Sequence, residues 1–376
     1  MIYLDYAATT PIHKKVLEKM MPYLKDSYGN ASSVHRFGQE ARQAIDESRE
    51  KLAKFLNCKL TEVIFTGSAT EANNLAIKGL VQGIKKEKSQ KIHVITCSIE
   101  HKSILESCKN LNVTYLPVGI DGLINLDDLE AEITPDTDLV SIMYANNEIG
   151  IIQDIEKIGK LIKKINKNKQ HKIYFHTDAV QAANWLICDV EKLGVDLLTL
   201  SAHKIYGPKG VGALYVRNGT PIIPLIVGGD HELRLRAGTE NVANIVGMGE
   251  AISLISPDKS IEKLRDKLIK QVLKIDGAKI NPYGIPNIAN FSFKGIEGEA
   301  LVISLDQQGF AVSTGSACTS SELVPSHVLK AIDLSDLDAH SSIRISLGKY
   351  TTDKEINNFL KILPDVVDRL RQISGR

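Results

Sequence analysis

Residues 199–216 read TLSAHKIYGPKGVGALYV, two short apolar runs joined by a turn that contains glycine and proline. Five further runs rich in β-branched residues recur upstream, from about residue 60, and stretches with helical periodicity separate them. These runs are EVIF (62–65), KIHVITC (91–97), VTYLPV (113–118), LVSIMYA (139–145) and KIYFHTD (172–178). Strands that alternate with helices are typical of a mostly parallel sheet covered by helices, so the sequence predicts an α/β fold.

The pattern changes near residues 245–265, where an apolar helix runs into a charged helical segment and then a strand region punctuated by proline. We therefore predict a large domain over residues 12–255. The segments IANFSF and SIRISL and the closing helical sequence predict a smaller α+β domain, formed by residues 256–376 together with residues 1–11. A chain of 376 residues exceeds the length that one hydrophobic core usually supports, which favours two domains.

The composition argues against several classes of partner. Lys and Arg total 46 against 45 acidic residues, so there is no basic excess of the kind that drives direct nucleic-acid binding. No run approaches the roughly 20 apolar residues that a membrane span needs. The start, MIYLDYAATTPIHKK, lacks the pattern of a secretory signal or transit peptide. We expect a cytoplasmic protein that acts on a small molecule.

The cysteines predict neither a disulfide framework nor a metal site. They are five in number and scattered, with no C-x-x-C pair: Cys58, Cys97, Cys108, Cys188 and Cys318. The first four lie in or beside apolar or helical patterns, where a buried free thiol is expected. Cys318 differs, because the surrounding segment STGSACTSS (313–321) otherwise contains only small residues.

Lys204 directly follows the strand predicted over VDLLTLS. Ligands of open α/β sheets bind at the carboxyl ends of the strands, and a poorly solvated lysine there has a lowered pKa suited to a Schiff base. The glycine fingerprints of NAD- and ATP-binding folds are absent, so another cofactor is needed. Taken alone, Lys204 is more simply interpreted as a surface lysine.

Two upstream motifs change that interpretation. Asp178 ends another predicted strand, and a carboxylate there would keep the pyridine nitrogen of pyridoxal phosphate protonated, although an isolated Asp is more simply a helix cap. In TGSATEANNLAI, a strand runs into small residues that include Ala69 and Thr70 and then into a helix, whose first N–H groups would receive a phosphate. Together with Lys204, these motifs predict a pyridoxal 5′-phosphate site.

His101 opens a predicted helix directly after the HVITC strand. It would lie over the cofactor ring as a stacking partner and as an acid or base. The simpler alternative is a histidine that only occupies a helix start.

The sequence resembles the pyridoxal-phosphate-dependent cysteine desulfurases of the NifS/IscS type, which belong to the class V aminotransferases of fold type I. The resemblance runs nearly end to end. It is carried by YLDYAATTP, GNASSVHRFG, TGSATEANNLAIKG, IEHKSIL, NNEIGIIQDI, TDAVQAA, SAHKIYGPKG, RAGTENVANIVGMGEA, STGSACTSS and SIRISLGKYTT. It implies a large domain with a mostly parallel sheet flanked by helices, and a smaller α+β domain that carries the active-site cysteine.

The resemblance also implies a role for individual residues. Lys204 would bind the cofactor covalently, Asp178 would hold its ring nitrogen, and His101 would stack on the ring. The remaining implied roles are Gln181 at the ring hydroxyl, Ala69, Thr70, Ser201 and His203 at the phosphate, Thr239 at the same phosphate from the other subunit of a homodimer, and Asn147 and Arg344 at the substrate carboxylate. Arginine suits that last role because its planar fork binds a carboxylate through two hydrogen bonds.

The implied reaction converts L-cysteine to L-alanine, with the sulfur passing to Cys318 as a persulfide. An accessible cysteine among small residues avoids the rise in pKa that burial causes, and it can sit on a movable connection. The GSACTS context resembles the branch that delivers sulfur to iron–sulfur scaffold proteins or to tRNA-thiolation carriers. One of these acceptors is therefore expected as a partner, beside a second copy of the chain.

Two alternatives stay open at this point. A selenocysteine lyase or a related β-eliminating enzyme would use the same cofactor residues. A non-catalytic sulfur-relay module on a decayed enzyme fold would have no need to keep Lys204, Asp178, His101 and Arg344 together, so we favour it least.

Overall fold

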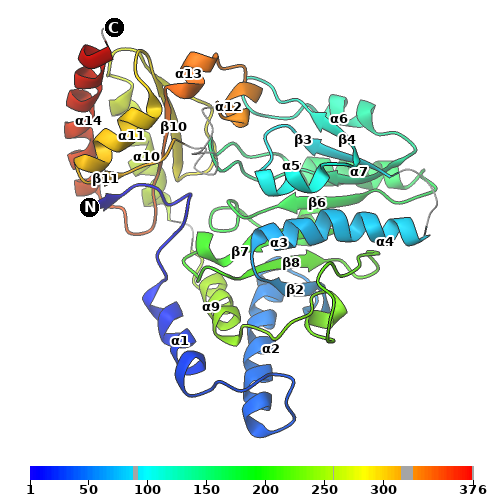
Figure 1. The fold of residues 1–376 in the computed structure, drawn as a ribbon. Helices are drawn as coiled ribbons and strands as arrows, with labels where there is room; N and C mark the ends of the chain where they lie inside the picture. The colour runs from blue at the N-terminus through cyan, green and yellow to red at the C-terminus, as the bar shows by residue number, and fades with distance from the viewer. Residues whose placement is uncertain (88–91, 257, 315–324, 375–376) are drawn as a thin grey trace.

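The seven runs predicted as strands form a single sheet in the computed structural model, which describes residues 1–87, 92–256, 258–314 and 325–374 (Figure 1). Its order is β2-β8-β7-β6-β5-β3-β4. The strands are β2 (Val63–Thr66), β3 (His93–Cys97), β4 (Asn112–Leu116), β5 (Thr137–Ser141), β6 (Tyr174–Asp178), β7 (Leu197–Ser201) and β8 (Gly212–Val216). The five strands from β7 to β4 run parallel, and β8 is antiparallel to both of its neighbours. The prediction of a mostly parallel sheet is confirmed.

The sheet is buried on both faces, because neighbouring residues of one strand enter different apolar clusters. In β7, Leu197 packs with the helices that follow β2, whereas Leu198 packs in the main core. Val94 and Ile95 of β3 divide in the same way. Strands that are covered on both sides have apolar residues at successive positions. The sequence therefore shows apolar runs and not an alternation of apolar and polar residues.

Helices cover the two faces (Figure 1). The helix after β2 has three parts, because a π-helical turn (Leu75–Gly79) joins α3 (Ala69–Asn74) to α4 (Leu80–Glu87). The others associated with the large sheet are α1 (Lys14–Lys25), α2 (Arg36–Leu56), α5 (Lys102–Cys108), α6 (Leu126–Glu132), α7 (Ile155–Asn166), α8 (Val190–Leu193) and α9 (Val242–Ser253). No helix among the described residues is long and apolar enough to span a membrane.

The carboxyl-terminal part forms a smaller α+β layer. An antiparallel sheet of order β12-β10-β9 contains β9 (Ala278–Ile280), β10 (Ile288–Phe293) and β12 (Ser342–Ser346). Around it lie α10 (Lys259–Val272), α11 (Gly298–Gln307), α12 (His327–Ala331), α13 (Asp336–His340) and α14 (Asp353–Ser374). This layer has an apolar core of its own, in which Phe291, Ile343 and Phe359 are fully buried.

The amino-terminal segment packs with this smaller layer. Strand β1 (Ile2–Tyr3) pairs in parallel with β11 (Phe310–Ala311), and Leu4 enters the small core. The domain limits 12–255 and 1–11 with 256–376 stay a prediction. Side chains of α12 and α13 pack into the main core, so the two layers share packing.

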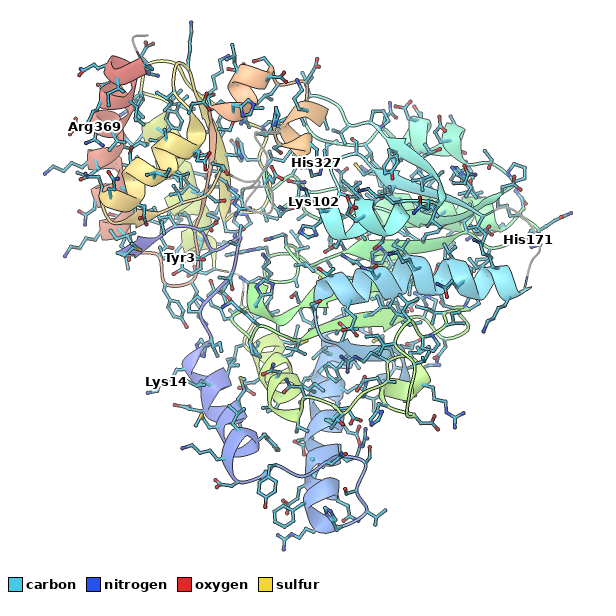
Figure 2. All side chains as sticks on the ribbon, in the orientation of Figure 1. Tyr3, Lys14, Lys102, His171, His327 and Arg369 are labelled. Carbon is cyan, nitrogen blue, oxygen red and sulfur yellow. The ribbon has the colours of Figure 1, made fainter. Side chains whose placement is uncertain are left out.

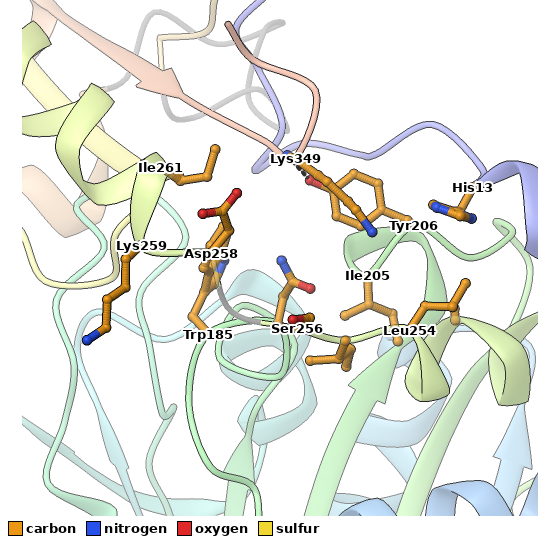
Figure 3. A pocket seen from close by; sticks show the side chains of 13 residues that line it. His13, Trp185, Ile205, Tyr206, Leu254, Ser256, Asp258, Lys259, Ile261 and Lys349 are labelled. Carbon is orange, nitrogen blue, oxygen red and sulfur yellow. Dashed lines mark hydrogen bonds between the residues drawn. The ribbon is translucent and has the colours of Figure 1, made fainter. Parts of the chain in front are cut away.

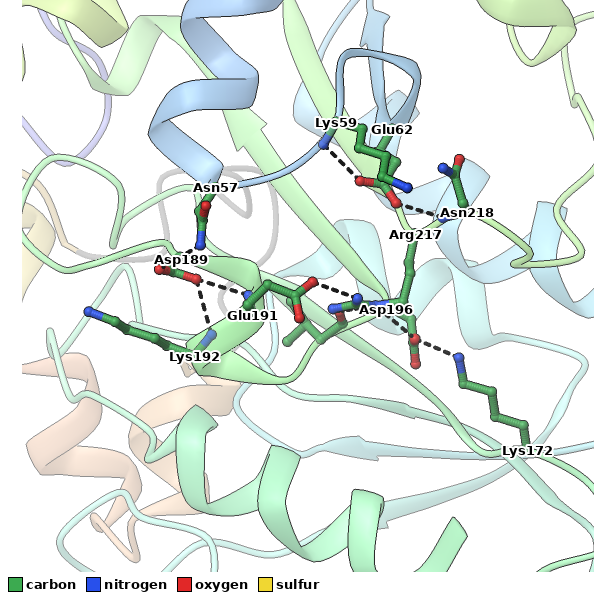
Figure 4. A network of polar contacts seen from close by, with 11 residues as sticks. Asn57, Lys59, Glu62, Lys172, Asp189, Glu191, Lys192, Asp196, Arg217 and Asn218 are labelled. Carbon is green, nitrogen blue, oxygen red and sulfur yellow. Dashed lines mark hydrogen bonds and ion pairs between the residues drawn. The ribbon is translucent and has the colours of Figure 1, made fainter. Parts of the chain in front are cut away.

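The amino-terminal edge of the large sheet carries a closed ionic network (Figure 4). Asp196, just before β7, accepts the Lys172 ammonium at 2.7 Å and the backbone N–H of Phe175 at 3.0 Å, and the Arg217 guanidinium lies 3.4 Å from it. Arg217 also pairs with Glu191 at 2.6 Å. Within it, Asp196 and Glu191 each face a cation, whereas the nearby carboxylates of Glu62 and Asp189 accept backbone N–H groups.

Candidate active site

The predicted cofactor residues gather at the opposite, carboxyl-terminal edge of the same sheet. Asp178 ends β6 and Ser201 ends β7; a single 3-10 turn after β7 then ends at Lys204. His101 follows β3 as the N-cap of α5. The charges of Asp178 and Lys204 both act on the pKa of His101, so the three side chains lie in one neighbourhood.

Backbone carbonyls of the amino-terminal segment receive the Lys204 side chain. Its Nζ donates to the carbonyl oxygens of Ala7 at 2.5 Å and Ala8 at 2.8 Å. The side chain of Gln181 donates to the same Ala7 oxygen at 3.0 Å. The motif YLDYAATTP thus contributes main-chain acceptors that bring Lys204 and Gln181 to a common point.

The same segment fixes the turn after Lys204. Tyr206 has φ +65°, a left-handed conformation that is costly for a residue with a Cβ. Its N–H donates to Thr10 Oγ1 at 2.8 Å, and its hydroxyl oxygen accepts the N–H of Lys349 at 2.6 Å. Strained backbone held by such contacts is frequent next to catalytic groups, where it positions a side chain.

Asp178 is buried and held by uncharged donors. Asn73 Nδ2 donates to its Oδ2 at 2.7 Å, and the N–H of Val180 donates to its Oδ1 at 2.9 Å. No described Lys or Arg forms an ion pair with this carboxylate, so its charge is oriented but not neutralised. Such a group is suited to hold a protonated ring nitrogen.

His101 is oriented through its Nδ1 atom. The backbone N–H of Ser103 donates to Nδ1 at 3.1 Å, and the Ser103 hydroxyl lies 2.8 Å from it. Burial is the main cause that lowers the pKa of His101, and the positive charge of Lys204 adds to it, while Asp178 opposes the shift. The imidazole is therefore neutral near pH 7.

The predicted phosphate cradle lies at the start of α3. Ser68 Oγ accepts the N–H of Glu71 at 3.2 Å, and the Glu71 carboxylate accepts the N–H of Gly67 at 2.8 Å. The backbone reaches this position only because Gly212 of β8 has no side chain; a Cβ there would lie 2.9 Å from the nitrogen of Ala69. Thr70, on the first turn of the helix, is exposed.

Ser201 and His203 flank the lysine on the β7 side. Ser201 is buried at the end of the strand. His203 Nδ1 lies 3.2 Å from Thr9 Oγ1, and burial together with the charges of Lys204 and Lys209 lowers its pKa to about 4. A neutral His203 can donate a ring N–H to an anion without carrying a charge itself.

Arg344 comes from the smaller layer and meets Asn147 of the larger one. Its Nη1 donates to the backbone oxygen of Asn147 at 2.7 Å, and its Nη2 pairs with Asp5 at 2.8 Å. The side chain is 3% exposed, and its Nε has no hydrogen-bond partner among the described residues. A buried guanidinium N–H without an acceptor is costly, so this donor is available to a ligand carboxylate.

Cys318 lies outside the described residues, but the residues on either side of its segment are placed. Ser313 exchanges two backbone hydrogen bonds with Arg344. On the other side, Ser326 donates to the buried carboxylate of Glu148 at 2.5 Å, and His327 Nε2 lies 2.9 Å from the backbone oxygen of Glu100 (Figure 2). The described residues on the two sides of the segment therefore lie close to the predicted site: Ser313 is bonded to Arg344, and His327 is bonded to the residue that precedes His101.

Thr239 is the predicted phosphate residue that belongs to the RAGTEN segment. It is exposed, three residues after Arg236, whose Nε donates to Glu71 at 2.9 Å. This ion pair brings the RAGTEN segment beside the start of α3 within one chain. The predicted contribution of Thr239 to a second subunit stays a prediction.

A separate cavity of about 360 Å³ opens where the large and small layers meet (Figure 3). Its lining includes His13, Trp185, Tyr206 and Lys349. None of the predicted site residues lines it, so it is distinct from the cluster around Lys204.

Sequence reasoning missed three buried groups in the cluster: Asn73, Ser103 and Glu100. Glu100 is fully buried; its pKa is raised by burial and by the charge of Asp178, and its Oε1 accepts the N–H of Met143 at 2.5 Å. All three lie inside motifs already quoted, TGSATEANNLAIKG and IEHKSIL. The available signal was a polar residue within two or three positions of a predicted site residue.

Comparison with known proteins gives a consistent result. Residues 2–359 match the aminotransferase class-V family. A cysteine desulfurase IscS from Dictyoglomus turgidum is 50% identical over 389 residues, which cover 99% of this chain and 96% of that protein. The chain belongs to the class-V aminotransferase family. Within it, the chain is of the cysteine desulfurase type, and the resemblance seen in the sequence is confirmed.

Other relatives agree with this assignment of family and fold. A cysteine desulfurase IscS from Methanosarcina thermophila is 44% identical, covering 99% of this chain and 93% of that protein. A solved NifS-like protein superposes with a TM-score of 0.90 at 39% identity, covering 98% of this chain and 100% of that one. A structure described as SspA in complex with cysteine superposes with a TM-score of 0.83 at 38% identity, covering 94% and 100%.

The residues present in this class-V aminotransferase fit pyridoxal phosphate. A buried, unneutralised carboxylate (Asp178), a lysine (Lys204), a neutral imidazole (His101) and a helix start packed against Gly212 supply the donor and acceptor types that the group requires. The described residues contain no cluster of His, Cys, Asp and Glu able to hold a metal ion.

Proposed function

We propose that this cysteine desulfurase converts L-cysteine to L-alanine and transfers the sulfur to Cys318 as a persulfide. The observation that carries the proposal is the meeting of Lys204, Asp178 and His101 at one sheet edge, next to a buried Arg344 with an unused donor. The family supports the reaction, and the described geometry supports it with a lysine, a carboxylate, an imidazole and a guanidinium.

Pyridoxal phosphate would be held by residues from several segments of the large domain. Lys204 would link to it, Asp178 would bind its ring nitrogen, Gln181 its hydroxyl, and His101 would stack on its ring. Ala69, Thr70, Ser201 and His203 would bind the phosphate, with Thr239 of a second subunit. When bound, the group supplies an electron sink that stabilises negative charge on the substrate carbon.

The substrate would be oriented by its carboxylate. Arg344 Nε is buried with no acceptor among the described residues, and Nη1 and Nη2 hold the backbone of Asn147 and the side chain of Asp5. A cysteine carboxylate at this guanidinium would satisfy the remaining donor. We place the side chain of Asn147 on the same carboxylate.

Sulfur transfer would then be a displacement on the substrate sulfur. The Cys318 thiolate supplies the electron pair of the new S–S bond, and the substrate C–S bond breaks with its electron pair left on carbon. A proton taken up by that carbon gives alanine, and Lys204 is the base and acid best placed to move protons there. The terminal sulfur of the Cys318 persulfide is then available to a thiol acceptor.

Partners and location extend the proposal. Large apolar side chains are exposed at Tyr28, Val34, Phe37, Val227 and Leu233, and such side chains would suit an interface with a second copy of the chain. An iron–sulfur scaffold protein or a sulfur carrier would be the acceptor. Four described cysteines are free thiols, which agrees with a reducing compartment, and we place the protein in the cytoplasm.

A matched pair of cysteine variants tests the proposal. The purified protein is incubated with L-cysteine and dithiothreitol, and alanine and sulfide are measured. We expect Cys318→Ser to lose at least about 10²-fold in turnover, as when a catalytic nucleophile is removed, whereas Cys58→Ser keeps it. Mass spectrometry should find the additional sulfur on Cys318. Full turnover of cysteine by Cys318→Ser would reject the assigned nucleophile, whereas selenocysteine turnover should depend far less on Cys318.

A further inference from the structure

A chain of three hydrogen bonds links the carboxylate of Asp178 to the ring of His101. Asn73 Nδ2 donates to Asp178 Oδ2 at 2.7 Å and to Ser103 Oγ at 2.8 Å. Ser103 Oγ lies 2.8 Å from His101 Nδ1. Asn73 is completely buried and Ser103 is 8% exposed, so water does not compete with these bonds.

The direction of each bond follows from the chemistry of its two ends. An ionised carboxylate only accepts, so the group of Asn73 that faces Asp178 is the amide NH₂. Its second hydrogen points to Ser103 Oγ, which accepts it. The Ser103 hydroxyl hydrogen is then available for His101 Nδ1.

The backbone gives the decisive constraint on the histidine. The N–H of Ser103 is always a donor and lies 3.1 Å from His101 Nδ1. Nδ1 therefore carries a lone pair and no hydrogen, and the hydrogen of the neutral ring is on Nε2. No described residue hydrogen-bonds Nε2, which leaves this N–H free for the site.

We propose that Asn73 and Ser103 are positioning residues that hold His101 as the Nε2–H tautomer. His101 then serves the site as a neutral hydrogen-bond donor, comparable to a fixed electrophile, and not as the base. Proton abstraction is left to Lys204. This inference deepens the proposed function, and the role of the Nε2–H donor in the reaction rests on that function. The tautomer itself can be observed without turnover.

Several charged groups face this ring and decide its pH behaviour. Lys102 on α5, Lys204 after β7 and His327 on α12 disfavour the imidazolium, and Asp178 on β6 favours it. Burial also disfavours it. The hydroxyl and the backbone N–H of Ser103 also disfavour the imidazolium, because a proton on Nδ1 would displace both of their hydrogen bonds.

Nitrogen NMR of the holoenzyme tests the proposal. The protein is labelled with ring-¹⁵N histidine, and His101 is assigned by comparison with His101→Gln. We expect a protonated Nε2 and an unprotonated Nδ1 from pH 7 to 8.5. A protonated Nδ1, or a mixture of tautomers, would overturn the inference.

Variants on α5 separate positioning from general structure. In Ser103→Ala the neutral ring loses a donor worth about one pKa unit, so the pKa of His101 should rise by about that amount. Ser103→Thr keeps the hydroxyl and should retain the wild-type value. Ser107→Ala is the matched control, since among the described residues the hydroxyl of this buried serine donates to the Ser103 carbonyl, at 2.6 Å, and its loss should leave the His101 pKa unchanged.

The outcomes distinguish this inference from the proposed function. If the tautomer is as expected but no alanine forms from cysteine, the proposed function fails and the positioning role stands. If alanine forms but Ser103→Ala leaves the His101 pKa at the wild-type value, the positioning role fails alone.

Discussion

The two edges of the large sheet treat charge in opposite ways. At the amino-terminal edge, Asp196 is met by Lys172 and Arg217, and the ions neutralise one another (Figure 4). At the carboxyl-terminal edge, Asp178 is met by an amide and a backbone N–H, and Lys204 by two carbonyl oxygens. Both edges are polar. At the carboxyl-terminal edge, however, neutral partners orient Asp178 and Lys204, and the charges of these side chains stay available for a ligand.

The difference separates a structural network from a catalytic one. Ions that neutralise each other stabilise the fold and leave little charge to attract a substrate. Charges held by neutral dipoles keep their field, which costs folding free energy but favours a ligand of complementary charge. Substitutions at equivalent positions of the two edges should therefore have opposite effects on activity and stability.

Asp178→Asn should give the largest effect. The variant keeps the shape of the side chain and removes its charge, so we expect turnover to fall by about 10²–10³-fold, the loss typical of one preorganised electrostatic group. Its melting temperature should stay within a few degrees of the wild type. Alanine formation and thermal unfolding measured on the same preparation check both statements. Retained turnover would show that this edge is organised for structure alone.

The next-largest effect is a dependence of stability on pH, which comes from His176 in the interior of β6. His176 is fully buried between Ser141 and Thr199, and burial lowers its pKa to about 3. The unfolded chain takes up this proton below about pH 6.5 whereas the folded chain does not, so stability falls as pH decreases from 6.5 toward 3. This histidine alone should remove about 2 kcal/mol of unfolding free energy by pH 5.

Urea denaturation between pH 5 and 8 measures this dependence. His176→Asn should be less stable at pH 8 but should show a flatter pH profile than the wild type. His13, His93, His101 and His203, whose pKa values are also lowered, contribute to the slope that remains. An unchanged slope in the variant would contradict the assignment to His176.

Asp196→Asn tests the amino-terminal edge. Lys172 and Arg217 would lose their common carboxylate, and we expect a loss of about 1–2 kcal/mol in unfolding free energy with unchanged turnover. Turnover and urea denaturation of the same sample give both quantities. A loss of turnover comparable to that of Asp178→Asn would remove the contrast between the edges.

Lys172→Met should give the smallest effect. The Lys172 side chain is 45% exposed, and its ammonium lies over the ring of Tyr174. A half-exposed ion pair contributes little, so the unfolding free energy should fall by less than about 0.5 kcal/mol. A larger loss in urea denaturation would mean that the network acts as one cooperative unit.

Strand positions were predictable because they depend on local composition. Each apolar run became a strand, but LVSIMYA extends beyond Ser141, where β5 ends. The reason is a long-range contact: the N–H of Met143 is bonded by the Glu100 side chain. Local patterns give the position of a strand, whereas its end is set by partners from elsewhere in the chain.

The site was predictable in part for the same reason. Lys204 and Asp178 stand at strand ends that the sequence reveals. Asn73 acts through partners 30 and 105 residues away, Ser103 and Asp178, which no spacing rule connects. The carbonyls of Ala7 and Ala8 carry no side-chain signal at all, since every residue has such an oxygen.

The pairing of the amino-terminal segment has a consequence for the order of biosynthesis. Ile2–Tyr3 pairs with Phe310–Ala311, and Asp5 bridges to Ser346, so this segment has to wait for partners that are synthesised much later than itself. The large sheet can assemble while the chain is still growing. Lys204 gains its stable carbonyl acceptors only after Phe310–Ala311 and Ser346 have been synthesised, so a nascent chain that has not reached them would not yet hold this lysine in its working position.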